Sequence, residues 1–366
     1  MMPKTYGMDV APFPFLSLQG ISNAIAIAIS YTIAPAAVLV YFLISGFLFW
    51  KGIEEWDWSA YRKKIRSRAT SLLQPYIVWN ILSILTFIIY ILIKDFHNGN
   101  AWANAFDYLK NIDLHFFWDY KYWGDNKVDW LGNPTPASGP FVVPLWFVRD
   151  LLVAVVLSPL IYWLIKKIKS YFLIILFLCY ISRIWPQIPG LTIDSLFYFS
   201  VGLYLAIMNK DLTAEARKYN LPLLIFASIT FAICVYFGGR GTGKGWYVFP
   251  FFTFCCVGCI VNLATYLVKR GKAKINPLIA QSSFFVYVLH ACPIAYFSTI
   301  IGAINEQVFA LTSYLHLPWL IYYFTSPVIV AAFCVAIYYL LARFCPRVAA
   351  CLSGGRVVTR IANKNA

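Results

Sequence analysis

The sequence predicts an all-α fold: a polytopic membrane bundle of about nine transmembrane helices, forming one domain over residues 1–366. The first reason is composition, because hydrophobic residues make up 61% of the chain and charged residues only 12%. A soluble domain carries about 25% charged residues. The second reason is the mean hydropathy of +0.69, which is too high for the apolar surface to be hidden in one water-soluble core. Lipid is therefore the expected solvent for most of the chain.

The expected helices follow continuous apolar runs. A spanning helix needs about 20 mostly apolar residues, whereas strands of a membrane barrel would be about 10 residues long with strict alternation. The runs are longer than such strands and do not alternate. They cover roughly residues 22–50, 71–94, 141–165, 170–185, 193–208, 219–237, 246–268, 277–301 and 318–344. Pro186, Pro189 and Gly190 separate the short fourth and fifth runs, and Pro35 and Pro327 predict kinks within two others.

The loops alternate in charge, and this alternation predicts the orientation. Segment 51–70 holds six basic residues, and further Lys and Arg follow the third, fifth and seventh runs and populate the tail 345–366. Segment 95–140 instead holds three Lys against six Asp. The positive-inside rule places the basic loops in the cytoplasm. We therefore expect a cytoplasmic C-terminal tail and an external N-terminus.

The longest polar stretch, residues 95–140, interleaves aromatic side chains with carboxylates. Aromatic faces beside carboxylates suit sugar rings, because the ring stacks and the hydroxyls form hydrogen bonds. An aromatic belt at the membrane interface is the alternative interpretation. The aromatic residues concerned are Trp102, Trp118, Tyr120, Tyr122, Trp123 and Trp130.

Ionisable side chains inside membrane spans are costly and are therefore candidates for function. Arg149 and Asp150 lie in the third run. Adjacent residues on a helix do not face each other, so we expect each of them to reach a different partner. A structural ion pair that locks helices together is the alternative.

His290 lies near the middle of the eighth predicted span, and Tyr287 lies three residues earlier on the same helix face. A neutral imidazole can act as a general base, although a buried His hydrogen-bonded to another helix fits equally. The other three histidines, His97, His115 and His316, form no ligand cluster with it. We expect no metal site.

Arg66 and Arg68 precede the second run. Guanidinium groups bind phosphate bidentately, so these residues suit an anionic cofactor such as coenzyme A. Anionic lipid headgroups, or a role in topology alone, are the alternatives. A nucleic acid partner is not expected, because the basic charge is spread over short loops.

Two motif-like patterns have simpler explanations. Cys256 and Cys259 form a CxxC within an apolar run without a second ligand pair, so we interpret them as packing residues. Residues 238–244 match G-x4-G-K, but Gly245 stands where a phosphate loop needs Ser or Thr. We interpret this segment as a flexible turn.

The order of four segments resembles the acyltransferase 3 family of bacterial membrane proteins. The first is residues 33–49, which contain the Phe-Leu-Ile-Ser-Gly-Phe-Leu signature at 42–48. The others are the basic run followed by residues 72–80, the Leu-Trp-Phe-Val-Arg-Asp-Leu stretch at 145–151, and residues 284–291.

The resemblance implies a ten-helix protein of the bacterial inner membrane that moves an acyl group, commonly acetyl, from cytoplasmic acyl-CoA to a hydroxyl of a cell-envelope glycan. It implies that Arg66 or Arg68 binds the cofactor phosphates, and that Trp146, Arg149 and Asp150 build the core of the site, with Trp146 on the cofactor side. The implied partners are acyl-CoA, an envelope glycan or lipid-linked saccharide, and membrane lipid.

One departure from the family pattern affects the predicted mechanism. Family members begin with a helix that bears an Arg and, about three turns later, a His regarded as catalytic, but no His precedes His97 here. We therefore expect a truncated start, a catalytically inactive relative, or another base such as His290. A transporter or flippase for lipid-linked sugars is the competing function, although no internal repeat favours it.

Overall fold

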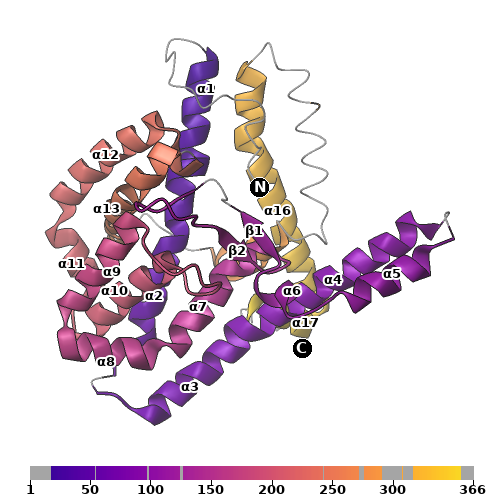
Figure 1. The fold of residues 1–366 in the computed structure, drawn as a ribbon, viewed down its shortest axis with the longest axis horizontal. Coiled ribbons are helices and arrows are strands. Elements are labelled where there is room, and N and C mark those ends of the chain that lie inside the picture. Colours follow the sequence, from indigo (N-terminus) through magenta and orange to yellow (C-terminus); the bar gives the residue numbers. More distant parts are fainter. Residues whose placement is uncertain are drawn as a thin grey trace.

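The fold is described from a computed structural model, which covers residues 18–53, 55–96, 99–123, 127–241, 243–271, 276–290, 307 and 316–355. Helices dominate this part of the chain, and its one sheet is a two-stranded antiparallel pair of β1 (Lys121–Trp123) and β2 (Ala137–Gly139) (Figure 1). The predicted all-helical class is therefore confirmed.

The first helices form two long rods. α1 (Leu18–Ala26) continues through a π-helical turn (Ile27–Ile33) into α2 (Ala34–Trp50), and α3 (Trp58–Arg68) continues through a second π turn (Ala69–Leu73) into α4 (Gln74–Lys94). Pro35 and Pro75 are each the second residue after a π turn. Proline has no N–H to donate and its ring clashes with the preceding turn, so that turn widens. The sequence predicted a kink at Pro35, and the structure has a π turn just before it within one continuous helical segment, Gly20–Trp50.

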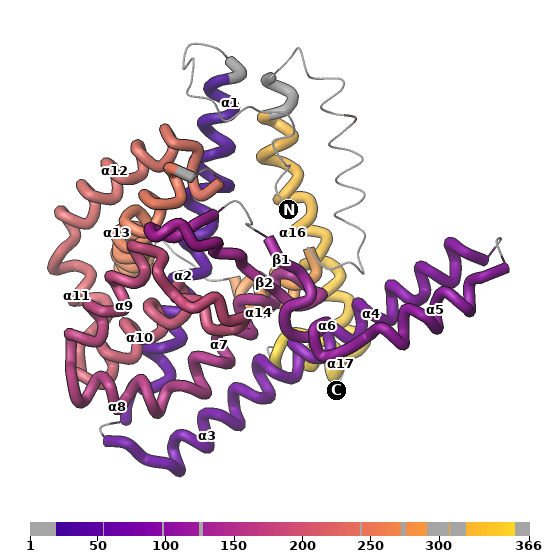
Figure 2. The backbone as a smooth tube through the Cα atoms, in the orientation of Figure 1, coloured from indigo at the N-terminus to yellow at the C-terminus, as the bar shows by residue number. Residues whose placement is uncertain are grey.

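The remaining helices build a body and an arm. α4 and the antiparallel α5 project from the body as the arm (Figures 1 and 2). The other helices are α5 (Ala101–Lys110), α6 (His115–Trp118), α7 (Trp146–Val156), α8 (Ser158–Ile168), α9 (Ser170–Ser182), α10 (Ile193–Ile207), α11 (Leu212–Lys218), α12 (Asn220–Tyr236), α13 (Gly243–Lys269), α14 (Pro277–Leu289), α16 (His316–Phe344) and α17 (Pro346–Ser353).

All nine predicted runs contain helix, but the count of nine spans is not confirmed. Within the described residues, four helices are long and apolar enough to cross a membrane, or up to six if each bent pair is one span. α7 and α8 bend by 58° and α11 and α12 by 72°. α9 has 13 residues and so is only about 20 Å long, against a hydrocarbon core of about 30 Å. Residues 291–301 of the eighth predicted span lie outside the described residues.

The Phe-Leu-Ile-Ser-Gly-Phe-Leu signature marks the closest helix crossing of the body. A Cβ on Gly46 would lie 2.1 Å from the carbonyl oxygen of Phe199, and one on Gly202 would lie 2.0 Å from that of Leu43. Small residues let membrane helices pack backbone to backbone. This crossing fixes α10, which carries part of the site described below, against α2.

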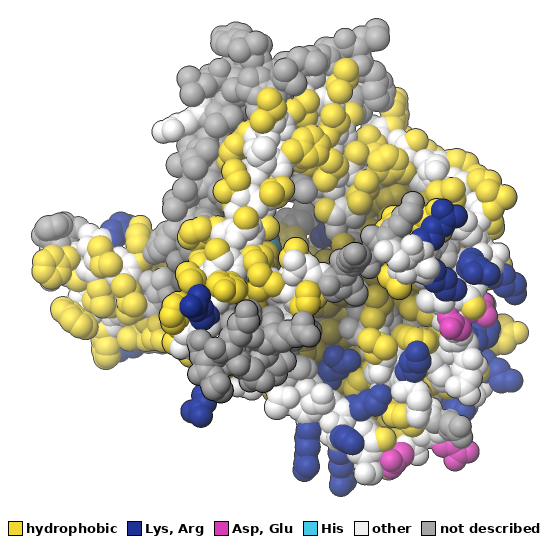
Figure 3. Space-filling model, turned by 180° about the vertical axis from the view of Figure 1, so that it is seen from behind, with side chains coloured by type: hydrophobic (Ala, Val, Ile, Leu, Met, Phe, Trp, Pro, Cys, Tyr) yellow, Lys and Arg dark blue, Asp and Glu magenta, His cyan; other side chains and the backbone are white. Residues whose placement is uncertain are grey.

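Basic side chains gather at one set of helix ends, here called the basic end. They occupy the last turns of α3, α8, α11 and α13, and Figure 3 shows Lys and Arg over the lower and right-hand part of the face that it draws. Hydrophobic side chains cover the upper part of that face. The apolar helices identify a membrane protein, and its orientation in the membrane stays a prediction.

Candidate functional site

Arg149 and Asp150 form a buried ion pair in the first turns of α7. Their relative exposures are 1% and 0%. Nε of Arg149 lies 2.9 Å and Nη2 lies 2.8 Å from the same oxygen, Oδ1 of Asp150. The prediction that each residue reaches a different partner was therefore wrong. The flexible arginine stem lets its fork meet the neighbouring carboxylate, although the two Cα–Cβ bonds diverge.

Every N–H of the Arg149 guanidinium is engaged. Beyond Asp150, Nη1 donates to the carbonyl oxygen of Trp118 at 2.5 Å and to Oγ of Ser138 at 3.3 Å, and Nη2 donates to the carbonyl oxygen of Ser138 at 3.0 Å. Arg has five N–H donors, and this geometry accounts for all of them. Arg149 thus ties α7 to α6 and β2.

Asp150 in turn ties α7 to the start of α10. Thr192 donates its hydroxyl to Oδ2 of Asp150 at 2.7 Å, and its oxygen accepts from the backbone N–H of Ser195 at 3.4 Å. Thr192 is the N-cap of α10, a position that favours Thr because its side chain satisfies a free N–H of the first turn. One hydroxyl therefore serves both the helix cap and the buried carboxylate.

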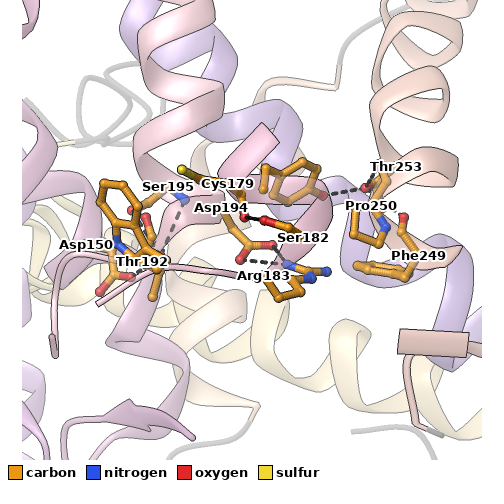
Figure 4. Close-up of polar contacts among 12 residues, drawn as sticks. Asp150, Cys179, Ser182, Arg183, Thr192, Asp194, Ser195, Phe249, Pro250 and Thr253 are labelled. Carbon is orange, nitrogen blue, oxygen red and sulfur yellow. Dashed lines mark hydrogen bonds and ion pairs between the residues drawn. The ribbon is translucent and has the colours of Figure 1, made fainter. Parts of the chain in front are cut away.

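A second pair, formed by buried Arg183 and partly exposed Asp194, was missed by the sequence reasoning. Arg183 is 3% exposed, and its Nη1 lies 3.3 Å from both carboxylate oxygens of Asp194. Its guanidinium carbon lies 4.1 Å from the ring centroid of Trp246 and 5.0 Å from that of Tyr180. Figure 4 shows Arg183 between the Asp150–Thr192 contact and Pro250 of α13.

Arg183 ends α9 with a φ of +59°. Non-glycine residues avoid this left-handed conformation, which costs about 1–2 kcal/mol. Surrounding contacts must therefore hold it, and such positions cluster at functional sites. Arg183 and Asp194 both lie inside predicted spans, so the rule that singled out Arg149 would have found them.

A cavity of about 100 Å³ is lined by both arginines, Arg149 and Arg183, and by Asp194. Polar and aromatic side chains form much of the rest of its wall: Tyr122, Thr135, Ser138, Trp185, Gln187 and Trp246. Among the aromatic residues predicted for sugar contact, Tyr122 lines the cavity, whereas Trp102 is exposed on α5. The long loop and the turn between α9 and α10 thus meet at one hollow.

Tyr287 and His290 approach α7 from α14. Tyr287 donates to the carbonyl oxygen of Pro144 at 2.5 Å, and its ring contacts Phe147 and His290 at centroid distances of 6.3 Å each. His290 is the C-cap of α14, and the residues that follow it in the eighth predicted span, 291–301, lie outside the described residues. Its Nδ1 lies 3.0 Å from the carbonyl oxygen of Val286. A carbonyl only accepts, so Nδ1 carries the proton and Nε2 keeps a lone pair.

The predicted cofactor residues lie on two different helices, α7 and α3. Trp146 begins α7 and its ring contacts Phe42 at 6.3 Å between centroids. Arg66 is exposed and Arg68 half-buried in the last turn of α3, and neither is among the hydrogen-bond partners found for Arg149 and Asp150. α3 meets the opposite end of α7, where Tyr61 donates to the carbonyl oxygen of Val156 at 3.2 Å.

A basic hollow of about 630 Å³ at the basic end was also missed. Arg217, Lys269 and Arg270 line it together with Asn220 and Asn262. The sequence reasoning used these cations only for topology. No group of three or more His, Cys, Asp or Glu able to hold a metal ion occurs among the described residues.

The segment 238–244, predicted to be a flexible turn, contains a short 3-10 helix (Gly239–Gly241). A Cβ on Gly245 would lie 1.9 Å from the carbonyl oxygen of Gly239, so the residue that breaks the phosphate-loop pattern is needed for close packing. Within this turn Arg240 is half-buried. Cys256 and Cys259 are free thiols one turn apart in α13, which fits the packing interpretation.

Comparison with known proteins defines the class. The sequence matches the acyltransferase domain of the acyltransferase 3 family over residues 7–342. The chain therefore belongs to this family of membrane acyltransferases.

One relative is the succinoglycan biosynthesis protein ExoH of Rhizobium meliloti (strain 1021). The two sequences are 23% identical over 360 residues, covering 94% of this chain and 85% of ExoH. No solved structure matches the chain.

Proposed function

We propose that the protein transfers an acyl group, acetyl in the simplest case, from acyl-CoA to a hydroxyl of an envelope polysaccharide or its lipid-linked precursor. Family membership supports the reaction class, and the name of ExoH, a succinoglycan biosynthesis protein, supports a saccharide acceptor. The observation that supports a saccharide acceptor is the cavity lined by Arg149, Arg183 and several polar and aromatic side chains. Such a wall suits the hydroxyls and apolar faces of a sugar.

The donor is proposed to enter from the basic end. Its phosphates need cations, and Arg66 and Arg68 at the end of α3 remain the proposed ligands, with Trp146 on the donor side of α7. Guanidinium groups suit phosphate because they bind it bidentately. Membrane lipid surrounds the apolar helices between the two ends.

The chemistry requires a base, because a sugar hydroxyl is a weak nucleophile. The Nε2 lone pair of His290 is the proposed acceptor of the hydroxyl proton. The sugar oxygen then forms a bond to the thioester carbonyl carbon, the C–S bond breaks, and the departing thiolate takes the proton back from His290. Tyr287 places His290 beside the start of α7 through its bond to Pro144.

Arg149 and Asp150 are proposed as positioning residues. The guanidinium has no N–H left for a developing oxyanion, so Arg149 does not suit the role of an oxyanion donor. Together they hold α6, β2, α7 and α10 around the cavity, and this fixes the cavity wall before an acceptor arrives.

The test is label transfer by the purified protein in proteoliposomes, using [14C]acetyl-CoA and the envelope glycan fraction of the host. We expect labelled glycan, and a loss of about 10²–10⁴-fold in rate for His290→Gln. His115→Gln is the matched control, because His115 is an exposed imidazole on α6. Absence of label in every glycan fraction overturns the proposed function. Equal rates for the two variants would assign the base to another residue.

A further inference from the structure

One edge of the Arg183 guanidinium is free. Among the described residues, Nε and Nη2 of Arg183 are buried and have no hydrogen-bond partner, whereas Nη1 contacts Asp194. Nε and Nη2 lie on the same side of the planar group, and such an edge binds a carboxylate or phosphate through two parallel hydrogen bonds. Tyr180 and Trp246 contact the guanidinium through their rings.

Two further polar atoms share this condition. Nε1 of Trp246 and Oγ1 of Thr135 are also buried without a hydrogen-bond partner in the described part of the chain. Both residues line the cavity that Arg183 lines. Buried polar groups are normally hydrogen-bonded, and unpaired ones cost free energy. Three donor N–H groups and one hydroxyl therefore belong to the wall of one small hollow.

The charge around this hollow is positive. Arg149 is matched by Asp150, and Asp194 offsets one further charge. Two cations, Lys127 and Arg240, remain beyond these pairs, and Nζ of Lys127 lies 4.4 Å from the Trp246 ring centroid. Burial together with Arg240 and Arg183 lowers the pKa of Lys127 to about 7, which shows how closely the cations crowd one another. An anion would relieve this repulsion.

The loop that carries Lys127 and Thr135 is firmly built. Asp129 accepts from the backbone N–H groups of Leu131 and Asn133 at 2.8 and 2.9 Å. The N–H of Trp130 donates to the carbonyl oxygen of Ser182 at 3.1 Å, next to Arg183. The donors are thus held in place by the fold itself.

Resting on the proposed function, we propose that this cavity binds an oxyanion of the acceptor, so that the acceptor is an acidic saccharide with a carboxylate or phosphate near the acylated hydroxyl. The free edge of Arg183 binds two of its oxygens, and the indole N–H of Trp246 and the hydroxyl of Thr135 complete the site. The small volume suits one anionic group with the sugar ring at its mouth.

Binding is tested with the whole protein in nanodiscs, by following its unfolding temperature against the concentration of D-glucuronate, D-glucose 6-phosphate or D-glucose. We expect at least one of the two anions to bind about tenfold or more tightly than glucose. A preference for glucuronate identifies a carboxylate, and a preference for the phosphate ester identifies a phosphate. Equal affinity for all three sugars overturns the proposal.

Arg183→Lys keeps the charge but loses the two-donor edge, so the anion affinity should fall about tenfold. Lys244→Gln is the matched control, because it removes an exposed charge near Trp246 and should leave affinity unchanged. If Arg183→Lys does not fold, Trp246→Phe tests the same site by removing the indole N–H. Unchanged affinity in the folded variant overturns the proposal.

Label transfer separates this inference from the proposed function. Transfer to neutral and acidic acceptors at equal rates would leave acyl transfer standing and overturn the acidic-acceptor inference. Selective anion binding without transfer to any acceptor would overturn the acyl-transfer function and confirm only the anion site.

Discussion

Arg149 and Arg183 are two buried arginines that line one cavity, and they use the same edge of the guanidinium differently. In Arg149, Nε and Nη2 both meet Asp150, and the remaining N–H groups meet backbone and hydroxyl oxygens. In Arg183, Asp194 contacts only Nη1, and Nε with Nη2 have no partner in the described chain. The two side chains are nearly equally buried and carry the same charge. They differ in how many of their guanidinium N–H groups are hydrogen-bonded.

This difference separates structural from binding roles more clearly than burial does. A saturated guanidinium has already formed its best contacts and can only hold the fold. An unsaturated one retains binding capacity that a ligand oxyanion can use. The following predictions test that division, from the largest expected effect to the smallest.

Removing the saturated arginine should cost the most stability. Arg149→Gln leaves Asp150 buried without a counter-ion, which destabilises proteins by about 3–5 kcal/mol. Denaturant unfolding in detergent micelles would measure the change. The double variant Arg149→Met with Asp150→Leu should recover much of the loss, because it removes both charges. A single variant within about 1 kcal/mol of the wild type would contradict the structural role.

The same substitution at Arg183 should lower the free energy of unfolding less than Arg149→Gln does, and it should weaken anion binding more. Arg183→Gln removes hydrogen bonds to Asp194, whose side chain is 27% exposed, so water can replace part of the contact. We expect a loss of about 1–3 kcal/mol, below that of Arg149→Gln measured in parallel. If Arg183→Gln lost more stability than Arg149→Gln, the assignment of a structural role to Arg149 and a binding role to Arg183 would be wrong.

The hydroxyl of Thr192 offers a finer test of the saturated side. Thr192→Val keeps the shape but removes the hydrogen bond to Asp150 and the N-cap of α10, which should cost about 1–2 kcal/mol. Thr192→Ser retains the hydroxyl and is the control. Thermal unfolding of both variants measures the effect, and equal stability of the Val variant and the wild type would show that the hydroxyl is dispensable.

The smallest expected effect is a pH dependence of anion binding. Lys127 faces Arg240, Arg183 and Asp194 among the described residues, and its pKa of about 7 lies below the usual value of about 10.4. A bound anion favours the charged form and raises this pKa. Affinity should therefore be highest below about pH 7 and fall severalfold as the pH rises towards about 9. Lys127→Arg stays charged and should flatten the profile, and a flat wild-type profile would exclude Lys127 from the site.

Apolar runs and charged loops predicted the helical class and the helix positions, because both follow from composition and periodicity. They did not predict the number of spans, since Leu157 and Tyr219 mark bends that depend on packing. The signature at 42–48 was recognised as a pattern, but its reason, the contact of Gly46 with α10, is tertiary.

The site was predicted in part. Arg149 and Asp150 were found because a charge in a span is conspicuous, but their mutual pairing depends on a side-chain rotamer that sequence does not reveal. Arg183 and Asp194 lie at the ends of two short helices, where a charge is easily attributed to a loop. The turn that joins those helices brings them together, and no periodicity in the sequence indicates that.

The most direct test of the account is the kinetics of acetyl transfer from acetyl-CoA to an acidic oligosaccharide fraction of the host envelope, by wild type and Arg183→Lys in proteoliposomes. We predict that the variant raises the acceptor KM about tenfold and leaves kcat and the KM for acetyl-CoA nearly unchanged, the sign of lost acceptor binding. An unchanged acceptor KM would contradict the assignment of the cavity to the acceptor.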